Sequence, residues 1–353
     1  MWKVVREVHL MQLPREVLLG ENLVEETVNV AKRLGLGRKA LVLYGPRTKG
    51  IAGKAVKDVL SGEYSVEGVT VKGATMEEVE RVLSIVRDHD SDWLIAVGGG
   101  SIIDVAKLAS FKAGVPFISF PTTASHDGIA SANASIRDLG LKTSLKAVPP
   151  VAVIADVKVI RTAPYRYLAA GVGDVISNLT AVKDWQLAHR IKGEYYSEYA
   201  ASLSLMSAKM IMRNADIIRL GNEESVRKVV KALISGGVAM SIAGSSRPAS
   251  GAEHLFSHAL DSLLEKPALH GEQVGVGTII TAYLHGLKWE RVRETLKRVG
   301  APTNAYELGI EPEVLIKALT TAHTIRPERY TILGKDGLTR EAAEKAAKIT
   351  GVI

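Results

Sequence analysis

Trp93-Leu94-Ile95-Ala96-Val97-Gly98-Gly99-Gly100-Ser101 joins a short apolar run to a cluster of three glycines. The run predicts a buried β-strand, and residues 102–111 continue with the apolar periodicity of a helix. Glycines at a strand-to-helix turn let the backbone pass close to a ligand, and the amides at the start of the helix favour a phosphate group. The stretch therefore predicts one unit of a parallel sheet with a phosphate-binding turn.

Similar units surround this one in the first half of the chain. Strands are expected at residues 39–44, 65–71, 116–120 and 152–155, and helices at residues 48–60 and 76–89. Continuous apolar strands that alternate with helices are typical of a parallel sheet covered on both faces. We therefore expect an α/β, Rossmann-like parallel-sheet domain that binds a dinucleotide over residues 1–160.

The pattern changes after about Pro164. Residues 196–218, 225–242, 270–287, 289–298 and 311–321 have helical periodicity, and no strand pattern lies between them. This change predicts a domain boundary near residue 160. Residues 161–353 are expected to form an all-α helical domain that binds a metal and the substrate.

Composition limits the classes of function. The chain has 353 residues, of which 46% are hydrophobic and 24% charged, as in globular proteins. It has no cysteine, so a metal site must use nitrogen and oxygen ligands. The net charge of +7 suits an anionic small molecule, but no basic stripe interleaved with aromatic residues indicates nucleic-acid binding. No apolar run indicates a signal peptide or membrane insertion, so we expect a cytoplasmic protein.

A second loop follows the strand expected at residues 116–120. Pro121-Thr122-Thr123-Ala124-Ser125 brings hydroxyl groups to the same carboxyl edge of the sheet, which is where open α/β sheets bind ligands. Together the two loops predict dinucleotide binding, although the G-x-G-x-x-G fingerprint is absent. Asp127, just beyond, is either a turn residue before Gly128 or a contact to a substrate hydroxyl.

Three of the nine histidines fall within eighteen residues of the second half. His254 and His258 are four residues apart, so a helix would put them on one face, and His270 follows Pro267. These three imidazoles predict a metal site, or two ligands with a third histidine that handles a proton. Asp174, in Gly171-Val172-Gly173-Asp174, opens the helical half and is either a helix cap or an oxygen ligand.

These motifs occur together in an order that resembles one family. Gly98-Gly99-Gly100-Ser101 with Asp104, residues 121–128, residues 171–174, Glu253-His254 with His258, and His270-Gly271-Glu272-Gln273 are the motifs concerned. The chain resembles the archaeal-type sn-glycerol-1-phosphate dehydrogenases, within the glycerol dehydrogenases, iron-type alcohol dehydrogenases and dehydroquinate synthases. The resemblance runs from about residue 18 to 330, and Ser125-His126-Asp127-Gly128 points to the glycerol-phosphate branch. It implies a dehydroquinate synthase-like fold.

The resemblance also implies roles for individual residues. Asp174, His254 and His270 match the family's metal ligands, usually for Zn²⁺. Asp127, Asp174 and His258 match substrate contacts, and we expect Asp127 and His258 to be catalytic, as candidates for moving a proton. The expected cofactor contacts are Gly98, Gly99, Gly100, Ser101, Ile102, Ile103, Asp104, Thr122, Thr123, Ala124, Ser125 and Ser131. Asn133 departs from the family, since many relatives have proline there.

The implied reaction is the reversible reduction of dihydroxyacetone phosphate to sn-glycerol 1-phosphate with NAD or NADP, which supplies the backbone of archaeal membrane lipids. The product's stereochemistry and a homo-oligomeric state are expected from the resemblance alone. The substrate phosphate needs cationic or N–H partners, and Lys142 and Lys146 in a hairpin and Arg326 are candidates. Arg47 is a candidate for the 2′-phosphate of NADP.

Three alternatives remain at this stage. The first is an NAD-dependent glycerol dehydrogenase that acts on unphosphorylated glycerol or dihydroxyacetone. The second is a cyclase of the dehydroquinate synthase type, and the third is a dinucleotide-binding sensor without activity. The identity of the metal also remains undetermined, because a site with one oxygen and two nitrogen ligands accepts Zn, Fe, Ni or Mn.

Overall fold

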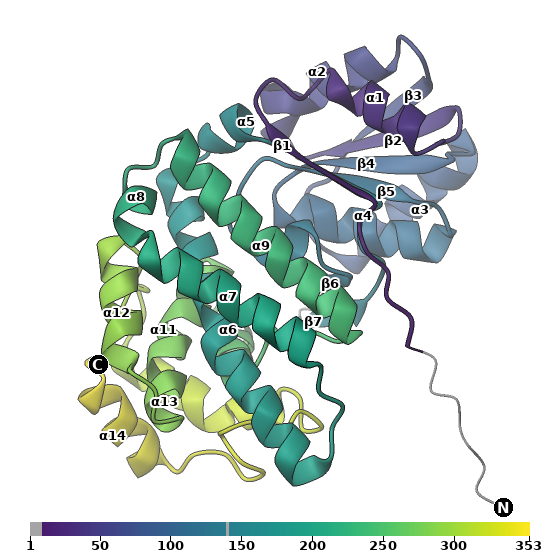
Figure 1. The fold of residues 1–353 in the computed structure, drawn as a ribbon. Helices are drawn as coiled ribbons and strands as arrows, with labels where there is room; N and C mark the ends of the chain where they lie inside the picture. The colour runs from purple at the N-terminus through teal and green to yellow at the C-terminus, as the bar shows by residue number, and fades with distance from the viewer. Residues whose placement is uncertain (1–8, 139–140) are drawn as a thin grey trace, which may run out of the picture.

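The computed structural model describes residues 9–138 and 141–353, and its first half is organised by a six-stranded parallel sheet (Figure 1). The sheet strands are β1 (Glu16–Gly20), β2 (Lys39–Tyr44), β3 (Ser65–Thr70), β4 (Trp93–Gly98), β5 (Phe117–Pro121) and β8 (Ala152–Asp156). Their order is β1-β8-β5-β4-β2-β3, and every neighbouring pair is parallel. The chain leaves β2 for β3 on one side and returns to β4 on the other, so the strand order reverses between β2 and β4.

Alternating residues of each strand feed two separate cores. In β2, Val42 packs with α1 (Glu26–Arg33) and α2 (Lys54–Leu60), which follows the π-helical turn η1 (Lys49–Gly53). Leu41 and Leu43 pack on the opposite face with α3 (Met76–His89) and α4 (Gly100–Ala113). Figure 1 shows these two pairs of helices on the two sides of the sheet. Burial on both faces explains why the strands are continuous apolar runs.

Helices make up the second half. They are α5 (Val157–Arg161), α6 (Tyr165–Lys192), α7 (Glu198–Arg213), α8 (Ala215–Arg219), α9 (Glu223–Ala243), α10 (Ala252–Leu263), α11 (His270–Leu284), α12 (Trp289–Arg298), α13 (Pro312–Thr321) and α14 (Arg340–Ile349), with the 3₁₀ turns η2 (Asp127–Ile129) and η3 (Ala322–Thr324). The described part of the chain beyond Asp156 contains no strand. The prediction of a parallel-sheet half followed by a helical half is therefore confirmed.

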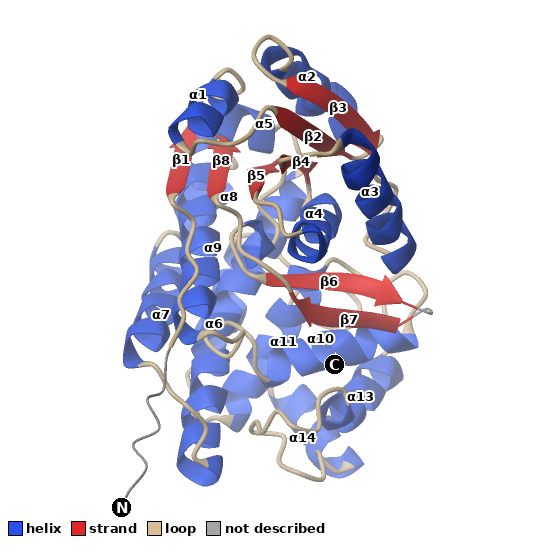
Figure 2. Ribbon diagram, turned by 90° about the vertical axis from the view of Figure 1, so that its right-hand side faces the viewer, coloured by secondary structure: helices blue, strands red, loops and turns tan. Residues whose placement is uncertain are grey.

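A hairpin packs between the two halves. Its strands, β6 (Asn133–Asp138) and β7 (Leu141–Lys146), pair antiparallel outside the main sheet. Figure 2 shows the hairpin between α4 and the helices of the second half, and β6 contacts α4 while β7 contacts α10. The hairpin therefore closes one side of the space between the halves.

Two local predictions were wrong. The helix expected over residues 196–218 is divided into α7 and α8 at Asn214, whose backbone is not helical. The Asn214 side chain donates to the Met210 carbonyl oxygen at 2.7 Å, a local bond that competes with helix continuation. Residues 171–174 do not open the helical half but lie inside α6, which begins after Pro164.

Helices α6 and α11 touch backbone to backbone at two glycines. A Cβ atom on Gly173 would lie 2.1 Å from the Gly271 carbonyl oxygen, and one on Gly271 would lie 1.9 Å from the Ala170 carbonyl oxygen. No Cβ atom fits at such distances, so the approach requires glycine at both positions. Asp174 and His270 are the next neighbours of these glycines along the chain, so the contact brings these two side chains together.

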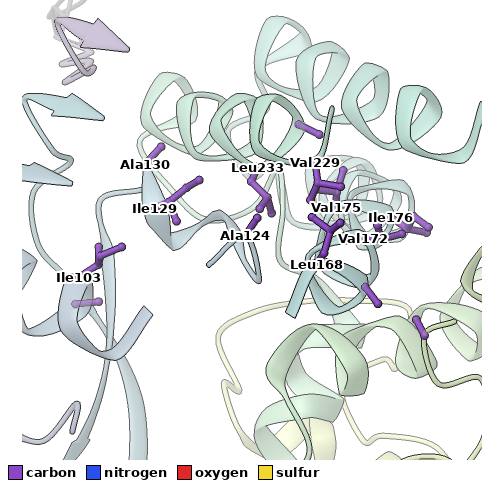
Figure 3. Packing of buried hydrophobic residues seen from close by; sticks show 14 of the residues in the cluster. Ile103, Ala124, Ile129, Ala130, Leu168, Val172, Val175, Ile176, Val229 and Leu233 are labelled. Atoms are coloured by element: carbon purple, nitrogen blue, oxygen red, sulfur yellow. The ribbon is translucent and has the colours of Figure 1, made fainter. Parts of the chain in front are cut away.

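The apolar core is continuous from the sheet half into the helical half. Figure 3 shows Ile103 of α4, Ile129, Val172 of α6 and Leu233 of α9 in one buried cluster. The space between the halves is therefore bounded on one side by packed side chains. None of the helices in residues 9–138 and 141–353 combines the length and apolar character needed to cross a bilayer.

Gly271→Ala tests the glycine contact. The added methyl group must push α11 away from α6, and we expect the free energy of unfolding to fall by about 1–3 kcal/mol. Guanidinium chloride unfolding followed by circular dichroism measures the change. Gly50→Ala is the matched control, because a Cβ atom there has nothing within 4 Å and should change stability by about 1 kcal/mol at most. Equal stabilities for the two variants would contradict the steric argument.

Candidate active site

A cavity of about 510 Å³ lies at the carboxyl ends of the central strands, where the strand order reverses. Its sheet wall includes Thr48 after β2, Gly99 and Gly100 after β4, and Thr122 after β5. Ligands of open α/β sheets bind at such a reversal. Thr48 Oγ1 accepts from the Gly45 amide and donates to the Val97 carbonyl oxygen, both at 2.8 Å. These bonds fix the loop after β2 against the end of β4.

The glycine turn between β4 and α4 has the predicted form. Gly99 is the N-cap of α4, and the first turn of this 14-residue helix lines the cavity. The imidazole of His126 lies directly over Gly100, where a Cβ atom would come within 1.9 Å of Nε2. His126 Nδ1 accepts the Gly128 amide at 2.9 Å, which leaves the ring proton on Nε2. The turn thus presents helix amides, which are suited to a phosphate, and the His126 ring packs over it.

A buried ion pair supports this turn. Lys107 of α4 is fully buried, and its Nζ lies 3.2 Å from Asp104 Oδ1. The same ammonium donates to the Asn133 carbonyl oxygen at 2.8 Å and to Ser131 Oγ at 3.4 Å. It therefore ties α4 to the start of the hairpin, and it fixes two of the predicted cofactor contacts, Asp104 and Ser131.

On the helical side of the cavity, Asp174, His254 and His270 converge. His254 and His270 line the cavity, and the buried Asp174 lies beside them. Their candidate ligand atoms lie within 4.8 Å of one another. Asp174 Oδ1 is 3.8 Å from His254 Nε2 and 3.7 Å from His270 Nε2. Ligands about 2.1 Å from a tetrahedral metal would be about 3.4 Å apart, close to these separations.

The Asp174 carboxylate fits the role of a ligand. Its Oδ2 accepts the Asp127 amide at 2.8 Å, whereas the buried Oδ1 accepts no hydrogen bond from the described residues. Burial raises the pKa of Asp174 well above its ordinary value, and the nearby Asp127 carboxylate raises it further. A bound cation would offset both effects, so the residues present fit a divalent metal.

The outer nitrogens of both imidazoles are held. His254 Nδ1 donates to Glu253 Oε1 at 3.0 Å, and Glu253 also accepts the Gly251 amide and the Thr180 hydroxyl. His270 Nδ1 lies 3.1 Å from Ser257 Oγ, which donates to Gln273 Oε1 at 2.8 Å. Since the serine proton is used, Ser257 accepts from His270. Both rings therefore keep the proton on Nδ1 and direct the Nε2 lone pair toward Asp174, as metal-binding histidines require.

Asp127 and His258 both line the cavity beside this cluster. Burial raises the pKa of Asp127 to about 6, while the nearby His254 and Lys107 oppose the rise. The His258 ring lies 5.9 Å from the His270 ring, and its Nδ1 is 4.0 Å from Asp261 Oδ2. Both side chains stand where a proton donor for a ligand in the cavity would be needed.

Most of the predicted cofactor residues line the cavity. They are Gly99, Gly100, Ser101, Ile102, Asp104, Thr122, Thr123, Ser125 and Ser131. Ile103 and Ala124 instead pack in the apolar core, and Gly98 lies beneath the Ile102 side chain. Any contact of these three residues with a dinucleotide is therefore made by backbone atoms.

The candidate phosphate-binding cations divide into two groups. Arg326 and Arg47 line the cavity, and Arg47 is exposed at its β2 end. Lys146 is exposed and does not line the cavity, and the Lys142 side chain lies outside the described residues.

Glu272, which neighbours the histidines in sequence, binds Arg166 at 2.5 Å and accepts the Leu269 amide. It stabilises the start of α11 and does not belong to the metal cluster.

Sequence reasoning did not identify Lys107, Thr48 and Ser257 as functional residues. Lys107 could have been found from its spacing, because Asp104 lies three residues before it on the same helix face. Ser257 lies between two predicted histidines on α10, but its relay to Gln273 depends on the packing of α10 against α11. Nothing in the local sequence indicates the bonds of Thr48.

Comparisons with known proteins give a family model, similar sequences and similar folds. The family model described as iron-containing alcohol dehydrogenase matches residues 18–164. A Thermococcus kodakarensis protein named as an NAD(P)+ glycerol-1-phosphate dehydrogenase is 83% identical over 349 residues, covering 99% of each chain. A Pyrococcus furiosus protein with the same name is 74% identical over 345 residues, covering 98% of this chain and all of the relative.

Among solved structures, glycerol dehydrogenase from Schizosaccharomyces pombe has a TM-score of 0.82 at 22% identity. The match covers 98% of this chain and 90% of that one. At this identity the likeness establishes the fold, a parallel-sheet half followed by helices.

Ser257→Ala tests the relay that orients His270. Without the hydroxyl, the Nδ1 proton loses its acceptor, and we expect divalent metal affinity to fall about 10- to 100-fold. Competition with a chromogenic chelator, using Zn²⁺ as the probe, measures the dissociation constant without an activity assay. Ser262→Ala on the same helix is the control, because its hydroxyl is bonded to the Ala259 carbonyl oxygen and its residue is exposed. An unchanged Zn²⁺ affinity in the Ser257 variant would show that the bond between Ser257 and His270 does not contribute to metal binding.

Proposed function

This chain belongs to the family of NAD(P)-dependent glycerol-1-phosphate dehydrogenases, and we propose that it interconverts dihydroxyacetone phosphate and sn-glycerol 1-phosphate. In the reductive direction, hydride from NAD(P)H goes to the ketone carbon and a proton goes to the ketone oxygen. The product would supply the glycerophosphate backbone of membrane lipids. The observation that carries the proposal is the convergence of Asp174, His254 and His270 beside a cavity that is lined by both histidines and by the glycine turn.

Asp174, His254 and His270 would hold one divalent metal, for which we propose Zn²⁺. When bound, such a metal acts as a Lewis acid that stabilises negative charge on the substrate oxygen. Glu253 and Ser257 hold the two imidazoles in the tautomer that leaves Nε2 available. The Asp127 amide holds Asp174 so that Oδ1 faces both rings.

Asp127 and His258 are the proposed catalytic residues that handle the proton and orient the substrate hydroxyl. A general acid must lie within hydrogen-bond reach of the atom it protonates and have a pKa near the working pH. Asp127 has a raised pKa because it is buried, and it adjoins the metal cluster through its own amide. His258 is four residues from His254 on α10, hence one turn along the cavity wall.

Residues 1–160 would act as the dinucleotide-binding domain, and residues 161–353 as the helical metal- and substrate-binding domain. NAD or NADP would extend along the carboxyl edge of the sheet, with its phosphates at the Gly99–Ser101 turn. Exposed Arg47, at the β2 end of the cavity, is the proposed partner of the NADP 2′-phosphate. This arrangement would bring the nicotinamide toward the metal cluster on the opposite wall.

We also infer that the protein acts in the cytoplasm, where both NAD(P)H and triose phosphates are available.

We further infer a homo-oligomer, and the evidence for it is one exposed apolar face of α7. Tyr199 is 86% exposed, and Met206 and Met210 are each 52% exposed. Their spacing of seven and four residues puts them on the same side of the helix, and such apolar faces commonly mark protein contacts.

A comparison of substrates tests the proposed activity. Because a phosphate group adds charge-assisted hydrogen bonds, we expect kcat/KM for dihydroxyacetone phosphate to exceed that for dihydroxyacetone about 100-fold or more. NADH oxidation followed at 340 nm measures both rates. Equal values would assign the chain to the glycerol dehydrogenase type. No net NADH oxidation with either substrate would favour the cyclase or sensor alternatives.

His254→Ala tests the ligand set. Removal of one of three ligands should lower metal content and activity together, each about 100-fold. Metal content is measured by elemental analysis after dialysis, and kcat by NADH oxidation. His189→Ala is the control, because His189 is exposed, does not line the cavity, and contacts the Glu194 carbonyl oxygen and the Tyr196 ring. A His254 variant that keeps both its metal and its rate would exclude the proposed ligands.

A further inference from the structure

A tight turn after η3 carries two arginines, and the first of them, Arg326, lines the cavity. Arg326, Pro327, Glu328 and Arg329 form a turn closed by the Arg329 amide, which donates to the Arg326 carbonyl oxygen at 2.9 Å. Proline suits the second position of such a turn because its φ is already fixed. The two guanidiniums therefore come from one rigid segment.

The second arginine of this turn holds the loop before α10. Arg329 Nη1 donates to the Ser250 carbonyl oxygen at 2.6 Å, and Nη2 donates to Ser246 Oγ at 2.8 Å. Ser246, Ser250 and Arg326 line the same cavity as His254. Since Ser250 is four residues before His254, this wall continues from the loop into the metal-binding helix.

Positive charge is in excess here. Arg247 is neutralised by Glu194, whose Oε1 accepts from Arg247 Nε at 2.7 Å. Within the described part of the chain, neither Arg326 nor Arg329 has a carboxylate within ion-pair distance. Burial lowers the pKa of Arg326. Burial and the neighbouring Arg326 and Arg247 lower the pKa of Arg329 to about 9. An anion in the cavity would offset the repulsion among these guanidiniums.

We propose that Arg326 binds the phosphate group of the triose substrate and thereby sets the preference for the phosphorylated ketone. This inference rests on the proposed function and adds the residue that selects its substrate. A guanidinium can bind two phosphate oxygens at once, which a lysine cannot do. Arg329 positions the wall, because two of its donors bond to Ser250 and Ser246.

The alternative anion is a phosphate of the cofactor. The cofactor's phosphates have a separate partner in the Gly99–Ser101 turn, on the sheet wall. Arg326 instead lines the helical wall with Ser250 and His254, where the substrate must lie to reach the metal cluster. Arg326 is also the one candidate of the three substrate-phosphate cations whose described side chain lines the cavity.

Steady-state kinetics of the metal-loaded enzyme with Arg326→Ala tests the proposal. We expect KM for dihydroxyacetone phosphate to rise about 10- to 100-fold. KM for NADH and kcat/KM for dihydroxyacetone should change about twofold at most, because neither depends on the substrate phosphate. Inorganic phosphate should compete with dihydroxyacetone in the wild type, and this inhibition should weaken by a similar factor in the variant.

Two further variants make the outcome specific. Arg326→Lys keeps the charge but loses the bidentate geometry, so KM for the phosphorylated ketone should be intermediate. Arg213→Ala, at an exposed residue that ends α7, is the control for a lost surface charge. An unchanged KM for dihydroxyacetone phosphate in the alanine variant overturns the inference, and so does an equal loss with both ketones. A rise in KM for NADH with no change for the ketone would assign Arg326 to the cofactor and also overturns it.

Measurements on the wild-type enzyme distinguish a failure of the proposed function from a failure of the Arg326 inference. If the wild type does not prefer the phosphorylated ketone, the proposed function fails before Arg326 is considered. If the wild type has the preference and Arg326→Ala keeps it, the proposed function stands and another group binds the phosphate.

Discussion

The contact between α6 and α11 is the constraint on which the cluster of candidate metal ligands depends. Gly173 and Gly271 let two helix backbones approach to a distance that excludes any Cβ atom. Each glycine has a candidate ligand as its neighbour in the chain: Asp174 follows Gly173 on α6, and His270 precedes Gly271 on α11. Since a ligand set tolerates little displacement, a site shared by two helices requires that their separation be fixed. The glycines have a positioning role although neither contributes a side chain.

Charge balance explains why this cluster suits a cation. Asp174, Glu253 and Asp184 are buried within the helical half, and each needs positive charge or hydrogen-bond donors. Asp184 has hydrogen-bond partners on both oxygens: His285 Nε2 lies 2.9 Å from Oδ1, and two backbone amides donate to the carboxylate. Glu253 accepts from an imidazole, a hydroxyl and an amide. Asp174 alone keeps a buried oxygen without a donor in the described structure, and that oxygen faces two imidazole nitrogens.

Elements and site residues whose positions depend on nearby residues in the chain were predictable from the sequence. Residues whose roles depend on tertiary packing were not. Apolar runs and glycine turns located β4 and α4 because strand burial and helix initiation act over a few residues. The spacing of His254 and His258 located one face of α10. No helix was predicted over residues 165–192, which form α6, because its inner residues are small and buried all round, so no polar face marks a helix. Ser257 and Arg329 act through partners that only the folded chain brings near.

The loop between β5 and β6 links the two binding regions. Its Thr122 amide bonds to the Gly98 carbonyl oxygen at 3.0 Å, and its His126 ring covers Gly100, so one end is fixed to the glycine turn. Its Asp127 amide, one residue beyond His126, bonds to Asp174, so the middle of the loop is fixed to the cluster of candidate metal ligands. Ala124 and Ile129 anchor the loop in the shared core (Figure 3). Because the loop is bonded to both the glycine turn and Asp174 and is anchored from behind, its shape fixes the spacing between the glycine turn and the candidate metal ligands. The proposed hydride transfer requires such a fixed spacing.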